Sequence, residues 1–377
     1  MLSLSPAAHT AQCLLAWYDR HHRDLPWRVS PPMARSGIMP RPYDVWLSEV
    51  MLQQTTVQAV KPYFEKFLRL WPEVTDLARA DTEEVMKAWA GLGYYARARN
   101  LKKCAEVVAT QHGGIFPDTE EGLKTLPGIG DYTAAAIAAI AFGRRSAVLD
   151  GNIERVFSRL YRVETPLPAA KPELRALVGE MTPEERPGDF AQGLMDLGAT
   201  ICTPKRPACA LCPLNEDCLA LKTADPETFP RKAAKKEKPV RVGAAFVAIR
   251  PDGSVLLRKR GDTGLLGGMT EVPGTEWTAR IDGDTTTASR PFDAEWEACG
   301  AIIHIFTHFE LRLSVYRANV AARFERNGDP ATGNAWWEAA ETLKDQALPT
   351  VMKKAIAQAI PDAFRPARVT KPRNVPT

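Results

Sequence analysis

At residues 126–143 the sequence reads LPGIGDYTAAAIAAIAFG, a turn followed by a helix of small residues. Gly128 and Gly130 permit a tight turn and leave backbone N–H groups accessible. These donors lie beside the N-terminus of the predicted helix Tyr132–Phe142, which Gly143 closes, so they suit one phosphate oxygen of a nucleic-acid backbone. A plain hairpin of two helices is the alternative. Because alanine occupies nearly every face, the helix must pack closely against its neighbours or against DNA.

The sequence on either side of this turn predicts further helices. From Pro6 to about Leu219, apolar residues recur at spacings of three and four, which is the helical period. Asp44 and Asp81 are expected to cap two of these helices. The stretch Ser30–Pro42 contains several prolines and a glycine and is predicted to be a loop.

Two carboxylates stand out because of their neighbours. Asp150 follows the apolar residues 147–149 and precedes a helix that begins at Ile153, so a helix cap is its default role. Glu49 lies within WLSEVML at residues 46–52, with apolar residues on both sides. If the fold encloses Glu49, burial should raise the pKa of its carboxyl group. The alternative is that Glu49 faces water.

Four of the seven cysteines crowd into one loop. They are Cys202, Cys209, Cys212 and Cys218. Clustering of this kind argues for a metal site rather than for a disulfide scaffold. Structural zinc usually has two C-x2-C pairs or a mixture of cysteine and histidine, which the single C-x2-C here fits poorly. The spacing therefore favours an iron–sulfur cluster over zinc, and over unligated core cysteines.

The C-terminal part of the chain has a different pattern. Residues 222–239 are rich in lysine and proline and predict a solvated basic linker. Beyond it, residues 240–249 and 254–257 alternate around a turn and predict a β-hairpin. A second strand pair is expected at 304–309 and 311–318.

These patterns predict a multidomain chain. We expect a helical domain at 1–221, the linker at 222–239, a smaller α/β domain at 240–362 and a disordered basic tail at 363–377. The 377 residues carry a net charge of +4, which permits a polyanionic partner without requiring one. The sequence shows neither a signal peptide nor an apolar run of the roughly 18 residues that a membrane span needs. We therefore expect a cytoplasmic protein.

Taken together, the motifs closely resemble the MutY family of adenine DNA glycosylases, within the helix–hairpin–helix superfamily. The matching stretches are LPWR at 25–28, VWLSEVMLQQT at 45–55, GLGYYARARN at 91–100, LPGIG at 126–130, LDGN at 149–152 and the four-cysteine loop. The resemblance covers Leu25 to Cys218. It implies an all-α glycosylase domain with the hairpin at about 118–143 and a [4Fe–4S] cluster on the loop 202–218.

The resemblance also assigns roles to the two carboxylates. It implies that Glu49 is the general acid, since protonation at N7 lets adenine depart as a neutral base. It implies that Asp150 stabilises the positive charge that grows on the deoxyribose, electrostatically or by transient covalent bonding. The adenine must first be flipped out of the stacked duplex into a pocket.

Tyr132 separates two branches of the superfamily. Endonuclease III-like enzymes have a lysine two residues after the last hairpin glycine, where it forms a Schiff base and cuts the strand. A phenol cannot form an imine, so the resemblance implies a monofunctional, hydrolytic glycosylase. Tyr132 and Asn152 are expected to hydrogen-bond Asp150 or the attacking water.

The same resemblance predicts contacts with substrate and DNA. Arg28 is expected to line the adenine pocket. Gln54 and Tyr94 resemble residues that enter the duplex around the opposite base, although a core aromatic is the alternative for Tyr94. The remaining predicted DNA contacts are Thr55, Leu92, Gly128 and Gly130.

From about Val240 the chain resembles, more weakly, the MutT-like (Nudix-type) domain that ends MutY proteins. The supporting stretches are RKR at 258–260, GLLGG at 264–268, EVPG at 271–274 and HIFTHFEL at 304–311. The Glu-rich helix that holds Mg²⁺ in Nudix hydrolases is absent from the sequence, so pyrophosphatase activity is not expected. Phe306, Thr307 and His308 correspond to a loop, usually F-S-H, that reads 8-oxoguanine in the family. Thr307 keeps the hydroxyl group but adds a methyl group. Met269-Thr270 also departs from the family, where a bulky aromatic residue is common, and Ser30–Arg41 is longer than usual.

The leading hypothesis is an adenine glycosylase of base excision repair. We expect a monomer, bacterial in type and associated with the nucleoid, that acts on adenine opposite 8-oxoguanine or guanine in double-stranded DNA, with replication and repair proteins as further partners. The alternatives are an endonuclease III-like pyrimidine-lesion glycosylase and lyase, a non-catalytic iron–sulfur protein that binds DNA, and a nucleotide-pool hydrolase.

Overall fold

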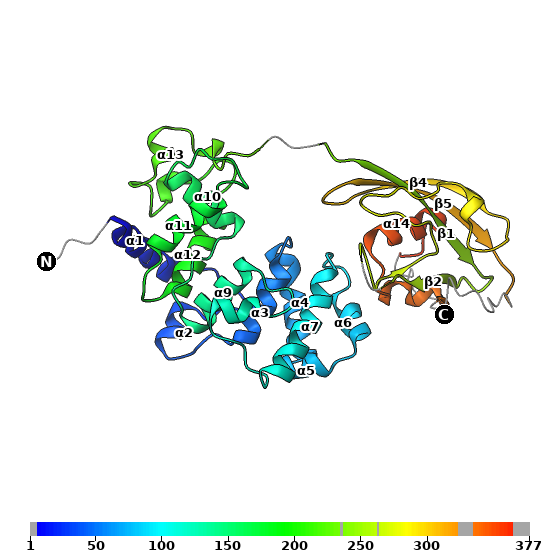
Figure 1. The fold of residues 1–377 in the computed structure, drawn as a ribbon, viewed down its shortest axis with the longest axis horizontal. Coiled ribbons are helices and arrows are strands. Elements are labelled where there is room, and N and C mark those ends of the chain that lie inside the picture. The colour runs from blue at the N-terminus through cyan, green and yellow to red at the C-terminus, as the bar shows by residue number, and fades with distance from the viewer. Residues whose placement is uncertain (1–5, 234–236, 262–263, 323–334, 365–377) are drawn as a thin grey trace, which may run out of the picture. The chain divides into compact units, whose positions relative to one another are not determined.

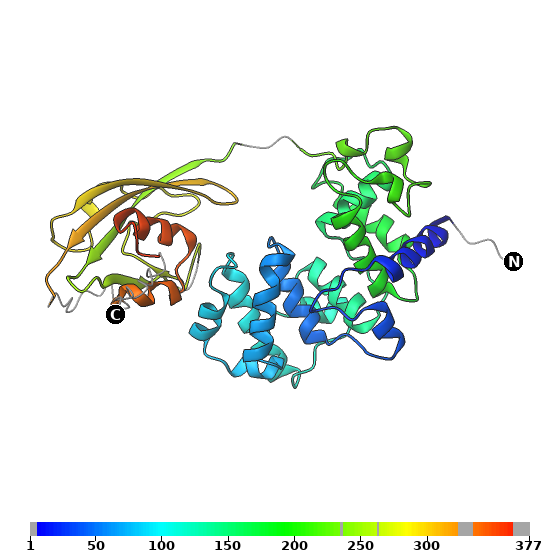
Figure 2. The ribbon, with the colours of Figure 1, turned by 180° about the vertical axis from the view of Figure 1, so that it is seen from behind.

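The computed structural model describes residues 6–233, 237–261, 264–322 and 335–364, as Figure 1 and the reverse view in Figure 2 show. The chain divides into two compact units. One comprises Met1–Val85 and Arg97–Lys235, and the other comprises Met86–Ala96 and Lys236–Thr377. The predicted tail lies outside the described residues from position 365 onward. No helix within the described ranges is long and apolar enough to cross a bilayer.

The N-terminal part of the chain is helical, as the sequence predicts. Its helices are α1 (Pro6–His21), α2 (Pro31–Arg35), α3 (Pro42–Leu52), α4 (Val57–Leu70), α5 (Val74–Arg79), α6 (Thr82–Trp89), α7 (Ala96–Gln111), α8 (Glu120–Lys124), α9 (Asp131–Phe142), α10 (Gly151–Leu160), α11 (Lys171–Met181), α12 (Pro187–Thr200) and α13 (Leu219–Lys222).

Two local predictions for this part are wrong. The stretch Ser30–Pro42 is not only a loop, because it contains α2, which starts with two prolines whose fixed φ suits a first helical turn. Asp44 is not a cap, because α3 begins two residues earlier, at Pro42. Asp81 does cap α6, since its carboxylate accepts a hydrogen bond from the Glu83 backbone N–H at 2.7 Å.

The glycine turn joins α8 to α9. Gly128 has φ of 78°, and a side chain there would place its Cβ 2.6 Å from the Cβ of Asn100, so only glycine fits. The close packing expected of the alanine-rich helix is confirmed. A Cβ on Gly188 of α12 would lie 2.7 Å from the backbone oxygen of Ala139 on α9. The two helices therefore approach almost backbone to backbone, and Ala134–Ala139 are buried.

Apart from the end of α6, the described part of the second unit is built on a mixed sheet and the helix α14. Among the described residues its elements are β1 (Val240–Ile249), β2 (Val255–Lys259), β3 (Thr270–Glu271), β4 (Glu297–Ile305), β5 (Glu310–Asn319), β6 (Ala335–Glu338) and α14 (Thr350–Ala359). The strand order is β3-β2-β1-β5-β4, with β6 paired to β2. The apolar side of the sheet packs against α14 (Figure 1).

The sequence locates these strands only in part. The predicted hairpin of β1 and β2 is confirmed as an antiparallel pair. The second predicted pair exists as β4 and β5, but β4 runs from Glu297 to Ile305, so residues 306–309 form the turn and not a strand. The mostly exposed side chains of β4 leave little alternation to reveal it.

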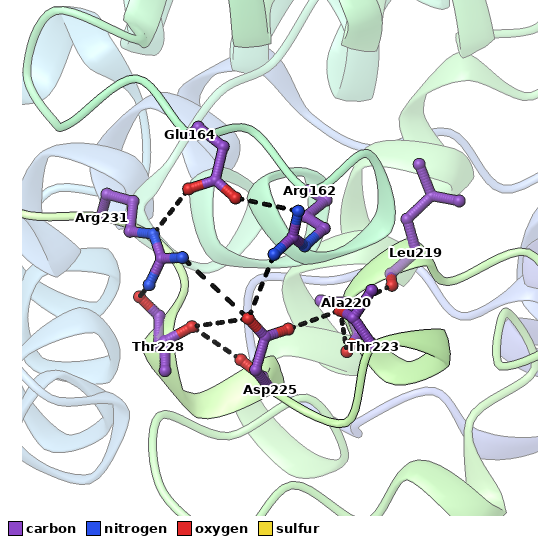
Figure 3. A network of polar contacts seen from close by, with 8 residues as sticks. All are labelled: Arg162, Glu164, Leu219, Ala220, Thr223, Asp225, Thr228 and Arg231. Carbon is purple, nitrogen blue, oxygen red and sulfur yellow. Dashed lines mark hydrogen bonds and ion pairs between the residues drawn. The ribbon is translucent and has the colours of Figure 1, made fainter.

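The prediction of a solvated linker from residue 222 is wrong as far as residue 232. Figure 3 shows Arg231 paired with Glu164 at 2.9 Å, and Asp225 between Arg231 and Arg162 at 4.0 and 3.6 Å. Phe229 is only 1% exposed, and the Arg231 guanidinium lies 4.2 Å from the centre of its ring. We call residues 225–232 the strap. It packs on the helical unit because one aromatic side chain is buried and the charges around it are paired.

Replacing Phe229 with alanine tests the strap. We expect Phe229→Ala to lower the free energy of unfolding of the helical unit by about 3 kcal/mol, because a buried aromatic side chain is lost. Urea unfolding followed by tryptophan fluorescence measures this change. Lys232→Ala, at an exposed neighbouring position, should change stability by no more than about 0.5 kcal/mol. Equal stability of the two variants would support the solvated linker instead.

Candidate active site

The helical unit contains a cleft with a volume of about 1250 Å³. It is larger than the usual range of roughly 300–1,000 Å³ for small-ligand pockets, so a flipped nucleobase fits. The cleft is bounded by the segment before α2, by α3, by the glycine turn and by the starts of α9 and α10. It is lined by Glu49, Tyr132, Asp150, Asn152, Arg28, Gln54, Thr55, Gly128 and Gly130. The structure therefore brings together nine predicted site residues from distant parts of the chain.

Glu49 lies on α3 and is 5% exposed, which rules out the alternative that it faces water. Its Oε2 accepts a hydrogen bond from the Tyr132 hydroxyl at 2.5 Å. The pKa of Glu49 is raised to about 7, chiefly by burial; the Tyr132 hydrogen bond opposes the rise, the charge of Asp150 adds to it, and the Arg28 charge opposes it. At neutral pH, Glu49 can therefore hold a proton and release it.

Asp150 is the N-cap of α10 and also lines the cleft, so helix capping and a role in the site are both open to this residue. Its Oδ1 accepts from the Ile153 backbone N–H at 2.7 Å, and its Oδ2 accepts from the Asn152 amide at 2.9 Å. Burial raises the pKa of Asp150, while these two hydrogen bonds oppose the rise by stabilising the carboxylate. Asp150 thus has donors that favour its ionised form.

Tyr132 binds a different carboxylate from the one that the sequence predicts. Its hydroxyl donates to Glu49 and not to Asp150. The start of α9 packs on α3, where the Gln53 amide also donates to the Thr133 hydroxyl at 3.2 Å. Burial raises the pKa of Tyr132 well above its usual value, so the phenol remains a neutral donor.

Asp196 was missed by the sequence reasoning. It lies on α12 with no exposed surface, and its two oxygens each accept a hydrogen bond from Arg28 Nη1 at 2.8 Å. Arg23 also donates to it, from its backbone N–H at 2.8 Å and from Nε at 2.7 Å. The available signal was the sequence FAQGLMDL at 190–197, where one carboxylate stands among apolar residues just as Glu49 does.

The other predicted DNA contacts lie in different settings. Gln54 and Tyr94 are non-glycine residues with φ of 56° and 48°, a strained conformation that is common at functional sites. Tyr94 is 48% exposed, so the alternative of a core aromatic is wrong. Thr55 accepts a hydrogen bond from Arg97 at 3.0 Å. Leu92 is buried and is not available at the surface in this structure.

The predicted loop of the second unit forms the turn between β4 and β5. Phe306 stacks on Phe309 with ring centres 4.7 Å apart, which anchors the turn. Thr307 and His308 are exposed at its tip. Within the same unit, the Thr307 hydroxyl lies 3.5 Å from that of Tyr94.

The four cysteines lie together at the end of α12 and in the loop after it. Among the described residues no group of three ligands is arranged to hold a single metal ion. Burial raises the pKa of Cys212 most, and the charges of Cys202, Cys209 and Cys218 add to the rise, so the four thiols lie near one another. The Arg159 guanidinium is buried and donates to Cys202 Sγ at 3.2 Å. Four thiolates beside a buried cation suit an iron–sulfur cluster.

Known proteins resemble the chain in each of its parts. The family model for HhH-GPD superfamily base excision DNA repair proteins matches residues 47–180, that for the NUDIX domain matches 244–358, and that for the iron–sulfur binding domain of endonuclease III matches 202–218. The human adenine DNA glycosylase is 34% identical, over 90% of this chain and 72% of its own. That of Buchnera aphidicola (subsp. Schizaphis graminum) is 30% identical, over 92% and 97%. A solved thermostable thymine-DNA glycosylase has 30% identity and a TM-score of 0.52, over 58% of this chain and 97% of its own.

A side-chain titration tests the coupling of Tyr132 to Glu49. We expect Tyr132→Phe to raise the pKa of Glu49, because the lost hydrogen bond stabilises the ionised carboxylate. NMR of ¹³C-labelled glutamate in the intact protein measures this pKa directly. Tyr161→Phe, on the far end of α10 and away from the cleft lining, is the control and should leave it unchanged. A pKa of Glu49 that stays the same in both variants would contradict the coupling.

Proposed function

The chain belongs to the adenine DNA glycosylase family, and we propose that it hydrolyses the N-glycosidic bond of adenine paired with 8-oxoguanine or guanine in double-stranded DNA. Excision of adenine in base excision repair follows from the family itself. The hydrolytic course, the mispairs and the roles of individual residues are the proposal. The observation that carries it is the presence of Glu49 and Asp150 in one cleft, in different electrostatic environments.

Glu49 is the proton donor in this proposal. Adenine is a poor leaving group as an anion, and a proton delivered to N7 lets it leave neutral. An acid with a pKa near 7 is well matched to that step at neutral pH. Tyr132 holds Oε2 of Glu49, and so directs the carboxyl group into the cleft.

Asp150 stabilises the sugar. Positive charge develops on the deoxyribose as the bond to adenine breaks, and an ionised carboxylate beside it lowers the energy of that state. Asn152 and the Ile153 N–H hold both oxygens of Asp150 in place, so the carboxylate needs little reorganisation during the reaction. Attack by water then completes the hydrolysis.

The side chains of the cleft support a monofunctional enzyme. Position 132, where a lyase would have its lysine, is a tyrosine. Lys171 also lines the cleft, but its Nζ is paired with Glu154 Oε1 at 2.9 Å. An ammonium group in an ion pair is not a nucleophile. The pyrimidine-lesion lyase is therefore the less favoured function.

Cys202, Cys209, Cys212 and Cys218 hold the [4Fe–4S] cluster of the protein. When bound, the cluster cross-links the loop and adds a charged redox group next to Arg159. No step of the hydrolysis is assigned to it.

The second unit is proposed to read the base opposite adenine. Thr307 and His308 are exposed at the tip of the β4–β5 turn, on an aromatic base that includes Phe306. A hydroxyl and an imidazole are suited to the extra N–H and carbonyl group that distinguish 8-oxoguanine from guanine. We further propose that the protein acts as a cytoplasmic, nucleoid-associated monomer and meets replication and repair proteins there.

Replacement of the general acid tests the chemistry. We expect Glu49→Gln to slow single-turnover release of adenine from an 8-oxoguanine:A duplex by roughly 10²- to 10⁴-fold, because the amide has no proton to give. Glu65→Gln, at an exposed position of α4, should match the wild type. A T:A duplex serves as the substrate control. Release by the Glu49 variant at the wild-type rate would rule out this mechanism.

Replacement of His308 tests the reading of the opposite base. His308→Ala should lower the single-turnover rate on 8-oxoguanine:A by roughly tenfold, the effect of about one hydrogen bond, and should change the rate on G:A much less. Thr307→Ser keeps the hydroxyl group and should preserve the preference. If the His308 variant loses the same factor on both duplexes, the proposed recognition is wrong.

A further inference from the structure

We propose that Asp196 is a positioning residue for adenine excision, whose buried carboxylate fixes the Arg28 guanidinium in the wall of the cleft and compensates its charge beside Glu49. The inference rests on the proposed function of the cleft. Asp196 hydrogen-bonds neither Glu49 nor Asp150, and it acts through Arg28.

Asp196 is fully buried on α12. The carboxylate has no exposed surface, and an ionised group in that position is stable only if it is paired and hydrogen-bonded. Within the described residues, the hydrogen bonds to this carboxylate come from two arginines: Arg28 Nη1 reaches both oxygens, and Arg23 supplies its backbone N–H and its Nε. Both residues also line the cleft. The Asp196 carboxylate thus holds two arginines of the cleft wall, although Asp196 is not itself among the lining residues.

Arg28 lies close enough to the catalytic pair for its charge to act on Glu49. The Arg28 side chain is 7% exposed, so water screens its charge poorly. The charged and titratable groups that act on Glu49 are Tyr132 from α9, Asp150 at the start of α10 and Arg28 from the segment before α2. Of these, only Arg28 is a cation, and its charge lowers the pKa of Glu49.

The ion pair with Asp196 limits the effect of the Arg28 charge on Glu49. An unpaired guanidinium in the wall would favour the ionised form of Glu49 and so remove the proton that adenine needs. It would also be free to turn toward the Glu49 carboxylate. A guanidinium held through Nη1 by both oxygens of Asp196 keeps its orientation, and the paired charges leave Glu49 protonated at higher pH.

The decisive experiment is Asp196→Asn in the full-length protein with its cluster. We expect single-turnover adenine release at pH 7 to fall roughly 10- to 100-fold, the effect of displacing a group that positions the substrate. As the pH rises, the rate should begin to fall at a lower pH than in the wild type, because Glu49 loses its proton at a lower pH. Affinity for the uncleaved duplex should stay within about threefold, and the cluster absorbance should be unchanged.

Asp189→Asn is the matched control, because Asp189 lies on the same helix but pairs with Arg186. It should show the wild-type rate and pH profile. Asp196→Glu restores the charge with one more methylene group. We expect it to lower the rate while leaving the pH of the decline as in the wild type, so it decides the question even if the asparagine variant does not fold.

The double variant Arg28→Gln/Asp196→Asn completes the test. If Asp196 acts through Arg28, the double variant is no slower than Arg28→Gln alone. The proposal is wrong if the rate loss of the double variant equals the product of the two single losses. It is also wrong if the Asp196→Asn enzyme has the rate and pH profile of the wild type. A wild-type protein that releases no adenine would instead refute the proposed function.

Discussion

The active site depends on one electrostatic constraint, which is that two carboxyl groups that are largely removed from water line one cleft and cannot both ionise cheaply. Burial raises the pKa of both, and the charge of Asp150 adds to the rise at Glu49. Their neighbours decide which group keeps the proton. Asp150 has two donors fixed by the start of a helix, whereas Glu49 has one phenol and an arginine whose charge is already paired with Asp196. The proposed division into an acid and an anion therefore rests on the surrounding side chains.

Small residues allow these neighbours to come so close. Helix α9 presents alanine to α12, and Gly188 lets the two backbones nearly touch. Gly198 does the same at the other end of α12, where a Cβ would lie 2.6 Å from the Cβ of Asn152. The residue that orients Asp150 thus packs on α12 itself. A bulkier residue at Gly188 would push α12 and its Asp196 away from α9, and one at Gly198 would push α12 away from the start of α10, where Asp150 lies.

The parts of the site that follow from local sequence could be predicted, and those that follow from tertiary packing could not. The glycine turn, the burial of Glu49 between apolar residues and the capping position of Asp150 are local features. The partner of Tyr132 depends on which helix the start of α9 meets, so its hydroxyl donates to Glu49 and not to Asp150. Asp196 pairs with residues about 170 positions away, and the strap is held by Glu164 and Arg162. Composition alone cannot distinguish a lysine-rich segment that packs from one that is solvated.

Tertiary packing also links the active site to the cysteine loop, to which no step of the hydrolysis is assigned. Arg155 of α10 donates through Nε to the Cys202 carbonyl oxygen at 2.7 Å, and through Nη2 to Asn152 Oδ1 at 3.0 Å and the Gly198 oxygen at 2.6 Å. Asn152 in turn holds Asp150. One guanidinium therefore joins the first cysteine of the loop to the anion of the active site. That loop has little apolar core of its own, so the four cysteines and the cluster that they hold keep it ordered. They therefore also help to fix the Asn152 amide, on which the geometry of Asp150 depends.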